Sequence, residues 1–271
     1  MIVFFLFVFF ITNLTAQESM TIISISPFYT HGKYSNEIDS DSKALYGTLN
    51  LDGDLISTFG IDLISLKHNN WDYKQNTYYL SFTKKISDYY VKISGALCKG
   101  DYLDNKFSFL NYQDKNFSFT TEFIYKYNWQ YYGVGFNYFN SSKGWQIVES
   151  GNLTLRYEAF LDYYNYLSVR PNIYLENKGK KLISISSKFI HWFNSDFLAN
   201  ISLTIGKRKY YFDNDLLTIY NQYETQKFVF GVALNYSLFN YLTISSGYQH
   251  KKFEEYNVNY FFLGFRSEFF L

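Results

Sequence analysis

The chain has 271 residues, and its 25 Lys and Arg against 24 Asp and Glu give a formal net charge of +1. Aromatic residues make up 23% of it, whereas it has two prolines and a single cysteine, Cys98. This aromatic content at near-zero net charge excludes a disordered chain, and one cysteine excludes an internal disulfide scaffold. Balanced charge also argues against a basic nucleic-acid-binding surface, so we expect no nucleic-acid partner.

The first sixteen residues differ from the rest. Residues 2–11 form an unbroken apolar run, and a short polar stretch then closes on Ala16. This is the layout of a secretory signal peptide, although no Lys or Arg precedes the run, and the run is shorter than the ~20 residues of a spanning helix. We expect residues 1–16 to be a cleaved signal and residues 17–271 the mature domain. A retained anchor is the alternative.

Beyond Ala16 the apolar residues are dispersed and alternate with polar ones. In residues 153–163, for example, Leu153, Leu155 and Tyr157 share one parity, and Thr154 and Arg156 take the other. Period two marks a β-strand with one apolar face. The alternating segments run for ten residues or more, which suits a membrane-spanning strand of about 9–11 residues better than an ordinary soluble strand of about 5–6.

Short turns alternate with longer polar segments along the chain. Asp52-Gly53-Asp54 is the first short turn. The polar segments between such turns are 34–41, 68–75, 102–115, 142–150, 177–181, 213–223 and a short one near 253–256. That alternation is typical of outer-membrane barrels, with short periplasmic turns and longer external loops. The predicted strands are 20–33, 43–51, 55–67, 76–86, 89–101, 116–127, 130–141, 151–163, 165–177, 181–193, 196–212, 224–238, 240–252 and 257–271.

The predicted fold class is therefore all-β: a transmembrane antiparallel up-and-down β-barrel of about fourteen strands. Residues 43–51 are the weakest segment, and without them and their neighbour the barrel has twelve strands. An even number places both mature ends in the periplasm. A soluble β-sandwich fits less well because the strands are long and because lipid requires a sheet without open edges.

The last strand carries a further signal. Phe261, Leu263, Phe265 and Phe269 share one face of residues 260–271. Such a strand at the end of the chain looks like the C-terminal signal that barrel-assembly machinery reads. We therefore expect that machinery as a partner during biogenesis and the outer membrane of a Gram-negative cell envelope as the location.

Three stretches of the second half resemble a known family. They are residues 131–139 with Gly144-Trp145, residues 153–157 continuing to 167–171, and residues 247–256. Together they are similar to the YaiO-type outer-membrane β-barrel family, although Leu271 departs from the ending typical of it. The resemblance implies an outer-membrane location and no established catalytic residues.

Catalytic and metal-binding patterns are missing from the sequence. A barrel enzyme with a Ser–His pair often places the two residues two positions apart on one strand face. None of His31, His68, His191 and His250 has a serine two residues on. With no His-Glu-x-x-His and no cysteine pair, we expect no catalytic residue, no metal and no cofactor. The Asp213-Asn214-Asp215 triplet is interpreted as part of a solvated external loop.

Parity assigns a set of charged side chains to the barrel lumen. They are Glu122, Lys126, Arg156, Glu158, Asp162, Arg170, Glu176, Lys188, Arg208, Arg266 and Glu268. Both signs are present, so they do not form the cationic ladder that an anion-specific pore would need. Two interpretations stay open: the charges pair across strands and help to plug the lumen, or they line a weakly selective aqueous path.

Other cations fall at the external ends of strands. Lys178, Lys180 and Lys181 share one external segment, Lys207 and Lys209 end one strand, and Lys251 and Lys252 end another. We expect these to contact phosphates of outer-leaflet lipopolysaccharide, because an ammonium group suits phosphate oxygens. A solvated rim is the alternative.

The predicted function is a non-enzymatic outer-membrane protein, either a narrow channel for small solutes or a structural barrel. A lipid-modifying barrel enzyme is the first alternative. A surface adhesion or partner-docking barrel, with loop 102–115 as its contact, is the second. Solute and oligomeric state do not follow from the sequence.

Overall fold

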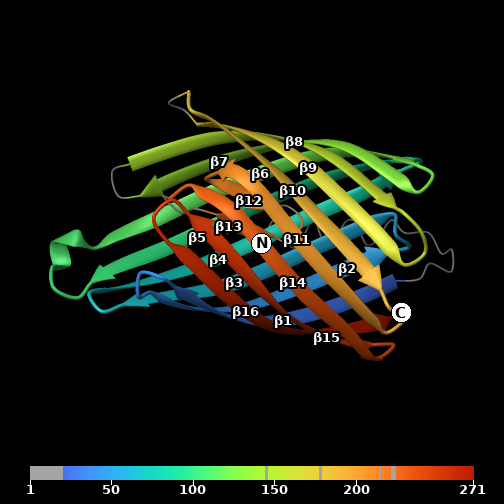
Figure 1. Ribbon diagram of the computed structural model, residues 1–271, viewed down its shortest axis with the longest axis horizontal. Helices are drawn as coiled ribbons and strands as arrows, with labels where there is room; N and C mark the ends of the chain where they lie inside the picture. The colour runs from blue at the N-terminus through green and yellow to red at the C-terminus, as the bar shows by residue number, and fades with distance from the viewer. Residues whose placement is uncertain (1–20, 144–145, 177–178, 214, 216, 221–223) are drawn as a thin grey trace.

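The computed structural model describes residues 21–271 except 144–145, 177–178, 214, 216 and 221–223. Fourteen strands form a closed barrel in which strands that are successive around the wall pair antiparallel, and β1 pairs with β16 to close it (Figure 1). The predicted all-β barrel of fourteen strands is confirmed. Within the described ranges, no helix is long and apolar enough to cross a membrane.

The wall strands run for 12 to 16 residues each. They are β1 (Thr21–Tyr34), β2 (Asp39–Leu51), β3 (Leu55–His68), β4 (Trp71–Ile86), β5 (Tyr89–Asp104), β6 (Tyr112–Tyr127), β7 (Gln130–Lys143), β8 (Gln146–Phe160), β9 (Asn165–Glu176), β10 (Lys181–Trp192), β11 (Phe197–Arg208), β14 (Gln226–Phe239), β15 (Leu242–Phe253) and β16 (Asn257–Phe270). A short 3₁₀ turn, η1 (Ser108–Leu110), and two three-residue strands, β12 (Tyr211–Asp213) and β13 (Thr218–Tyr220), complete the described elements.

Side-chain alternation explains why these segments form a barrel wall. On β6, Asn116, Ser118 and Thr120 point inward and are buried, while Phe117 and Phe119 point outward and are exposed. The same alternation recurs around the wall, and the outer surface is covered by Phe, Leu, Ile and Tyr. The inward face carries small polar and charged side chains, together with buried aromatic residues such as Tyr79, Phe139 and Tyr174. An apolar outside with a polar inside is the pattern of a barrel whose solvent is lipid.

The two ends of the barrel differ. At one end, which we call the turn end, strands join through short turns such as Asp52–Gly53, where both residues have positive φ (51° and 72°) and Asp54 N donates to Leu51 O at 2.9 Å. Two successive positive φ values define a type I′ hairpin turn, so the predicted turn is confirmed. Thr21 and Leu271 also meet at the turn end through backbone hydrogen bonds of 2.9 and 3.2 Å.

At the opposite end, the loop end, several predicted loops are shorter than expected. Strand β2 begins at Asp39, β4 at Trp71, β6 at Tyr112 and β8 at Gln146, and β5 continues to Asp104. The predicted loops 34–41, 68–75, 102–115 and 142–150 were therefore too long. Beyond the width of the apolar band both faces of a strand meet water, so the hydropathy alternation fades while backbone pairing continues.

One predicted external loop is not external. Strand β11 ends at Arg208 rather than at residue 212, and within the predicted loop 213–223 the described residues turn into the barrel, where β12 and β13 pair with each other. We call β12, Asp215, Leu217 and β13 the lumen hairpin. Its aromatic and aliphatic side chains are buried: Tyr211, Phe212, Leu217, Ile219 and Tyr220. The polar residues at its tip suggested a loop, but the apolar residues on both sides draw it into the lumen.

Candidate functional site

Aromatic contacts hold the lumen hairpin in the loop-end half of the barrel. The Tyr211 and Tyr220 rings stack with centroids 4.3 Å apart, and Phe212 stacks on Tyr79 of β4 at 6.0 Å. Just before the hairpin, the Tyr210 carbonyl accepts a hydrogen bond from Ser150 Oγ at 2.7 Å. The hairpin thus packs on β4, and the residue that precedes it is held to β8.

Cys98 lies beneath this hairpin. Its thiol faces the lumen and is buried in the same apolar cluster as Phe212, Leu217 and Ile219. Asn116 Nδ2 donates to its sulfur at 3.3 Å. The hairpin is therefore part of what covers this thiol.

Two cations stack on the hairpin's tyrosines. The Arg208 guanidinium, buried at the base of the hairpin, lies 4.5 Å from the Tyr211 ring centroid, and its Nε donates to Gln226 Oε1. Lys251 Nζ lies 4.7 Å from the Tyr220 ring centroid. The expectation that Lys251 belongs to the outer rim was wrong, because it has the inward parity of β15 and is buried in the lumen.

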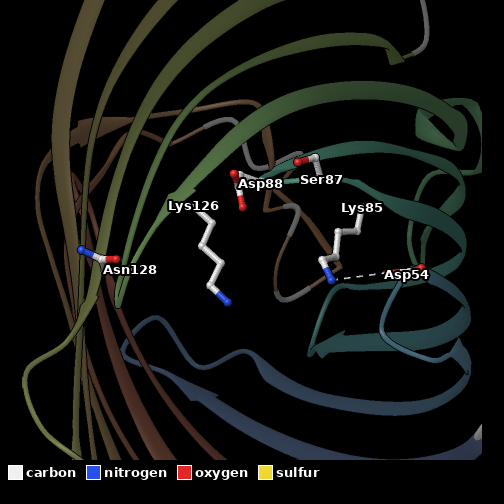
Figure 2. A pocket seen from close by; sticks show the side chains of 6 residues that line it. All are labelled: Asp54, Lys85, Ser87, Asp88, Lys126 and Asn128. Carbon is white, nitrogen blue, oxygen red and sulfur yellow. Dashed lines mark ion pairs between the residues drawn. The ribbon is translucent and has the colours of Figure 1, made fainter.

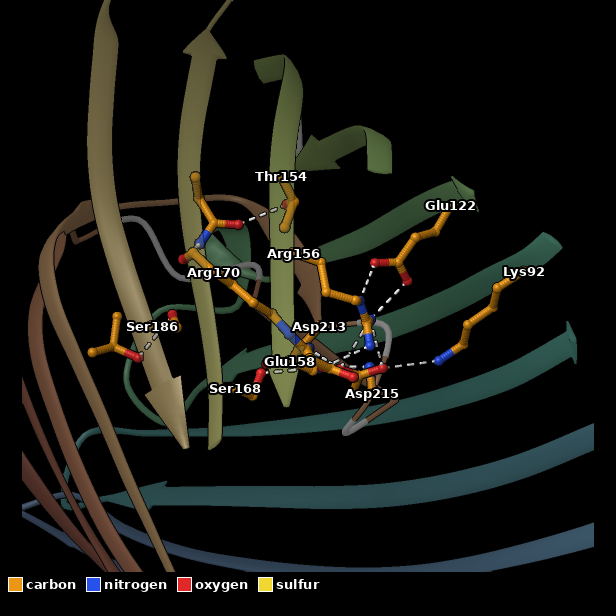
Figure 3. A network of polar contacts seen from close by, with 12 residues as sticks. Lys92, Glu122, Thr154, Arg156, Glu158, Ser168, Arg170, Ser186, Asp213 and Asp215 are labelled. Atoms are coloured by element: carbon orange, nitrogen blue, oxygen red, sulfur yellow. Dashed lines mark hydrogen bonds and ion pairs between the residues drawn. The ribbon is translucent and has the colours of Figure 1, made fainter. Parts of the chain in front are cut away.

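The tip of the hairpin meets a network of charges from the wall (Figure 3). Arg156 donates through Nε and Nη2 to both carboxylate oxygens of Glu122, at 2.5 and 2.8 Å, and through Nη1 to Glu158 at 2.9 Å. Arg170 donates to the same Glu158 carboxylate. These four residues come from β6, β8 and β9 and lie toward the turn end, and Arg156 and Glu122 are more than 90% buried.

Asp215 of the hairpin completes the network. Its carboxylate is 3.0 Å from Lys92 Nζ and 3.2 Å from Arg156 Nη2, and it also pairs with Arg170. The interpretation of Asp213 to Asp215 as a solvated external loop was therefore wrong for Asp215; Asn214 lies outside the described residues. Sequence reasoning also missed Lys92, although the parity of Ala96 and Cys98 on β5 would have assigned it to the lumen.

The remaining predicted lumen residues are divided between the two ends of the barrel, with Glu176 at the loop end. Lys188 faces inward on β10 opposite Ser168, and Glu176 is at the other end of β9. Arg266 and Glu268 pair at 2.6 Å near the end of β16. Glu176 Oε1 is buried without a hydrogen-bond partner in the described part of the chain.

Asp162 does not lie in the lumen. Strand β8 ends at Phe160, and Asp162 sits in the turn that follows, where it accepts hydrogen bonds from Asn165 Nδ2 and from Tyr164 N at 2.7 Å each. These donors hold the pKa of Asp162 below its usual range. Parity fails here because the alternation continues in the sequence past the point where the backbone turns.

A polar vestibule opens at the turn end of the lumen (Figure 2). It has a volume of about 600 Å³, and its walls come from three successive turns. Lys85 Nζ lies 3.5 Å from Asp54, and the predicted lumen residue Lys126 extends into the same space. The lining residues are Asp54, Lys85, Ser87, Asp88, Lys126 and Asn128.

The predicted rim cations occupy different surroundings. Lys180, Lys181 and Lys252 are exposed at the loop end, and the Lys207 side chain is 57% exposed, with its Nζ 3.9 Å from Glu254. The Lys209 ammonium lies 4.8 Å above the Tyr210 ring, and partial burial lowers its pKa. Lys178 lies outside the described residues.

His191 and His250 each lie within hydrogen-bond distance of an asparagine side chain on a neighbouring strand or turn. His191 Nδ1 is 2.9 Å from Asn165 Oδ1, and His250 Nδ1 is 2.8 Å from Asn259 Oδ1. Both side chains have the outward parity of their strands. Among the described residues, no group of three or more His, Cys, Asp or Glu is placed to hold a metal ion.

No protein-family model matches the chain, and no curated protein matches it. Its fold is similar to three solved outer-membrane proteins. CymD, a monoaromatic hydrocarbon channel, has a TM-score of 0.63 at 7% identity over 94% of this chain and 89% of that one. A FadL homologue of Pseudomonas aeruginosa has a TM-score of 0.58 at 5% identity over 92% and 90%. The toluene transporter TodX of P. putida has a TM-score of 0.54 at 8% identity over 94% of this chain and 90% of that one.

At these identities the similarity shows the fold alone. The fold is that of the outer-membrane β-barrels of Gram-negative bacteria, and the hydrocarbon channel CymD and the toluene transporter TodX share it. The resemblance to the YaiO-type family stays a prediction, since no family model matches.

Proposed function

We propose that this chain is a narrow, non-enzymatic outer-membrane channel for small solutes and that the lumen hairpin is its plug. One observation carries the proposal: the hairpin lies across a polar lumen, and a single carboxylate at its tip pairs with three wall cations. A barrel with a purely structural role needs a filled interior, but it does not need a filler that is separate from the wall.

The wall is complete without the hairpin. Strands β11 and β14 pair directly with each other, from Phe197↔Tyr236 to Arg208↔Gln226. Movement of the hairpin therefore breaks no strand pairing of the barrel. What it would uncover is a lumen lined by the inward Ser, Thr and Asn side chains of β4 to β10, together with Tyr79, Phe139 and Tyr174.

The channels of similar fold support transport in general but not their particular solutes. CymD and TodX are described as channels for aromatic hydrocarbons. Here the wall around the hairpin carries aromatic residues, but the path beyond its tip is polar and charged, so we propose hydrophilic solutes. The two interpretations of the interior charges, as a plug and as the lining of an aqueous path, then describe two states of one channel. The charges close the lumen when Asp215 is paired with them, and they line the path when Asp215 has moved away.

The test is single-channel conductance in planar bilayers. We would compare the wild-type barrel with a variant in which residues 211–220 are replaced by a short Gly-Ser linker. Discrete, larger conductance steps in the variant, with the wild type mostly closed, are the expected result. A variant that inserts, as judged by heat-modifiable gel mobility, and still conducts no current would favour the structural barrel.

Cys98 gives a second readout in the native chain. It is the single cysteine of the sequence and is 2% exposed beneath the hairpin. A charged, water-soluble maleimide should label it slowly in the wild type and many times faster in the linker variant. Equal labelling rates would mean that the hairpin does not control access to the lumen.

A further inference from the structure

The charges that hold Asp215 form a binding site for a carboxylate. Lys92 of β5, Arg156 of β8 and Arg170 of β9 converge on its two oxygens (Figure 3). Arg156 Nη2 lies 3.2 Å from Oδ1 and 3.3 Å from Oδ2. Hydrogen bonds from guanidinium and ammonium groups to a carboxylate belong to the strongest class of protein hydrogen bond. We call these three cations the carboxylate cradle.

The cradle is built by the wall and not by the hairpin. Both carboxylate oxygens of Glu122 fix the Arg156 guanidinium, and Glu158 accepts from Arg156 and Arg170 together. Ser168 Oγ in turn donates to Glu158 at 3.1 Å. The two guanidinium groups of the cradle therefore have wall partners that do not depend on Asp215.

Removal of Asp215 leaves the cradle short of an anion. The three cradle cations against Glu122 and Glu158 give a net charge of +1, which Asp215 brings to zero. The Arg156, Arg170 and Lys92 side chains are 8%, 19% and 15% exposed. A partly buried excess charge is costly unless it is paired. An open lumen would therefore favour another anion at this position.

Unused polar atoms adjoin the cradle. A cavity of about 80 Å³ borders Arg156 and Arg170 and is lined by Asn137, Asn152 and Thr154 among others. In the described part of the chain, Arg170 Nε and the Oδ1 atoms of Asn137 and Asn152 are buried without a hydrogen-bond partner. Asn137 and Asn152 are 3% and 4% exposed. The Arg170 Nε–H can donate to a hydroxyl oxygen, and the two asparagine Oδ1 atoms can accept from hydroxyl groups. These atoms therefore suit a carboxylate that also carries hydroxyl groups.

We propose that the carboxylate cradle binds a small hydroxylated organic carboxylate, which takes the place of Asp215 and so releases the lumen hairpin. This inference rests on the proposed function and deepens it, because it assigns the solute class and the signal for opening. The Asp215 side chain is then the internal competitor of the solute.

Binding can be tested without transport. We would titrate detergent-solubilised protein with gluconate, with sorbitol as the uncharged polyol of equal chain length, and follow heat of binding and thermal stability. Asp215→Ala should bind gluconate and not sorbitol, and more tightly than the wild type. Adding Lys92→Ala to Asp215→Ala should weaken gluconate binding about tenfold or more, as expected for the loss of one charged hydrogen bond. Lys99→Ala, on the outward face of the same strand, is the matched control and should change nothing.

Opening is tested separately. In the wild type, gluconate should speed maleimide labelling of Cys98, whereas sorbitol should not. If Asp215→Ala conducts but binds gluconate no better than sorbitol, the carboxylate site is wrong and the channel stands. If Asp215→Ala and the linker variant insert without conducting while gluconate still binds through Lys92, the channel is wrong and the site stands.

Discussion

Gly206 lies where the chain leaves the wall and turns into the lumen. It has φ of 104°, and a Cβ at this position would lie 2.4 Å from the Ile183 carbonyl oxygen on the neighbouring strand. The register of β11 against β14 shifts between Ile205 and Arg208, immediately before the chain turns inward. Only glycine combines this φ with so close an approach of two backbones.

Gly206→Ala should therefore destabilise the barrel by about 1–3 kcal/mol, the cost of a strained backbone position. Urea unfolding in detergent micelles would measure it. Gly151→Ala is the matched control, because its Cβ would meet ring atoms of Phe136 no closer than 3.6 Å. Equal midpoints for the two variants would contradict the role of Gly206.

The exposed rim cations carry a separate prediction. We propose that Lys207 and its neighbours at the loop end contact lipid phosphates, and each lysine near an anionic lipid surface contributes about 1 kcal/mol. Lys207→Glu combined with Lys209→Glu should then co-purify severalfold less lipopolysaccharide and melt at a lower temperature. Lys84→Glu, exposed near the turn end, is the control. If the double variant co-purifies as much lipopolysaccharide as the wild type and melts at the same temperature, the rim lysines are solvated and do not bind lipid.

At the scale of elements, the wall and the hairpin depend on different interactions. The wall is a continuous backbone ladder, with β5 and β6 paired from Tyr89↔Tyr125 to Tyr102↔Tyr112. The lumen hairpin has only the three-residue pairing of β12 with β13 and is held by rings and ion pairs. An isolated pair so short is not stable by itself, so its position depends on the lumen around it.

Replacing residues 211–220 with a linker should thus leave the barrel folded. The heat-modifiable shift in gel mobility and the β-sheet circular dichroism should be retained. Thermal stability should fall, because Arg208 loses both of its ring partners and Lys251 keeps Tyr260 but loses Tyr220. The same linker inserted between β14 and β15 serves as the length control. A variant that no longer shows the mobility shift would mean that the hairpin is needed to fold the wall.

The whole molecule presents an apolar outer band with aromatic side chains at the turn end. Trp129, Tyr163, Tyr164, Phe193 and Tyr241 are all more than half exposed and lie in or beside its turns. Aromatic rings with a polar tip favour the boundary between lipid and water, where barrels carry aromatic girdles. The exposed apolar surface is therefore explained by lipid around the barrel.

Insertion into an outer membrane requires export. We propose that residues 1–16, which lie outside the described residues, are removed as a signal peptide after translocation. Mass spectrometry of protein purified from outer membranes should then give a chain that begins at Gln17. Recovery of the chain with residues 1–16 still attached would instead support a retained anchor.

The wall of the barrel could be predicted from the sequence. Side-chain period, strand length and turn spacing predicted fourteen antiparallel strands and the inward parity of Glu122, Arg156, Glu158 and Arg170, because lipid outside and polar groups inside impose period two on every strand. Strand ends at the loop side were predicted less well, because both faces there meet water.

The contents of the lumen follow from the folded barrel and could not be predicted from the sequence. The segment around Asp215 has no alternation and too few residues to reveal a strand, and its polar tip resembles any solvated loop. Its position follows from groups that are distant in the sequence, Lys92, Arg156 and Arg170, which the closed barrel brings to one point. Local hydropathy determines which face of a strand is wet, whereas the partner of a buried charge is set by the closure of the whole sheet.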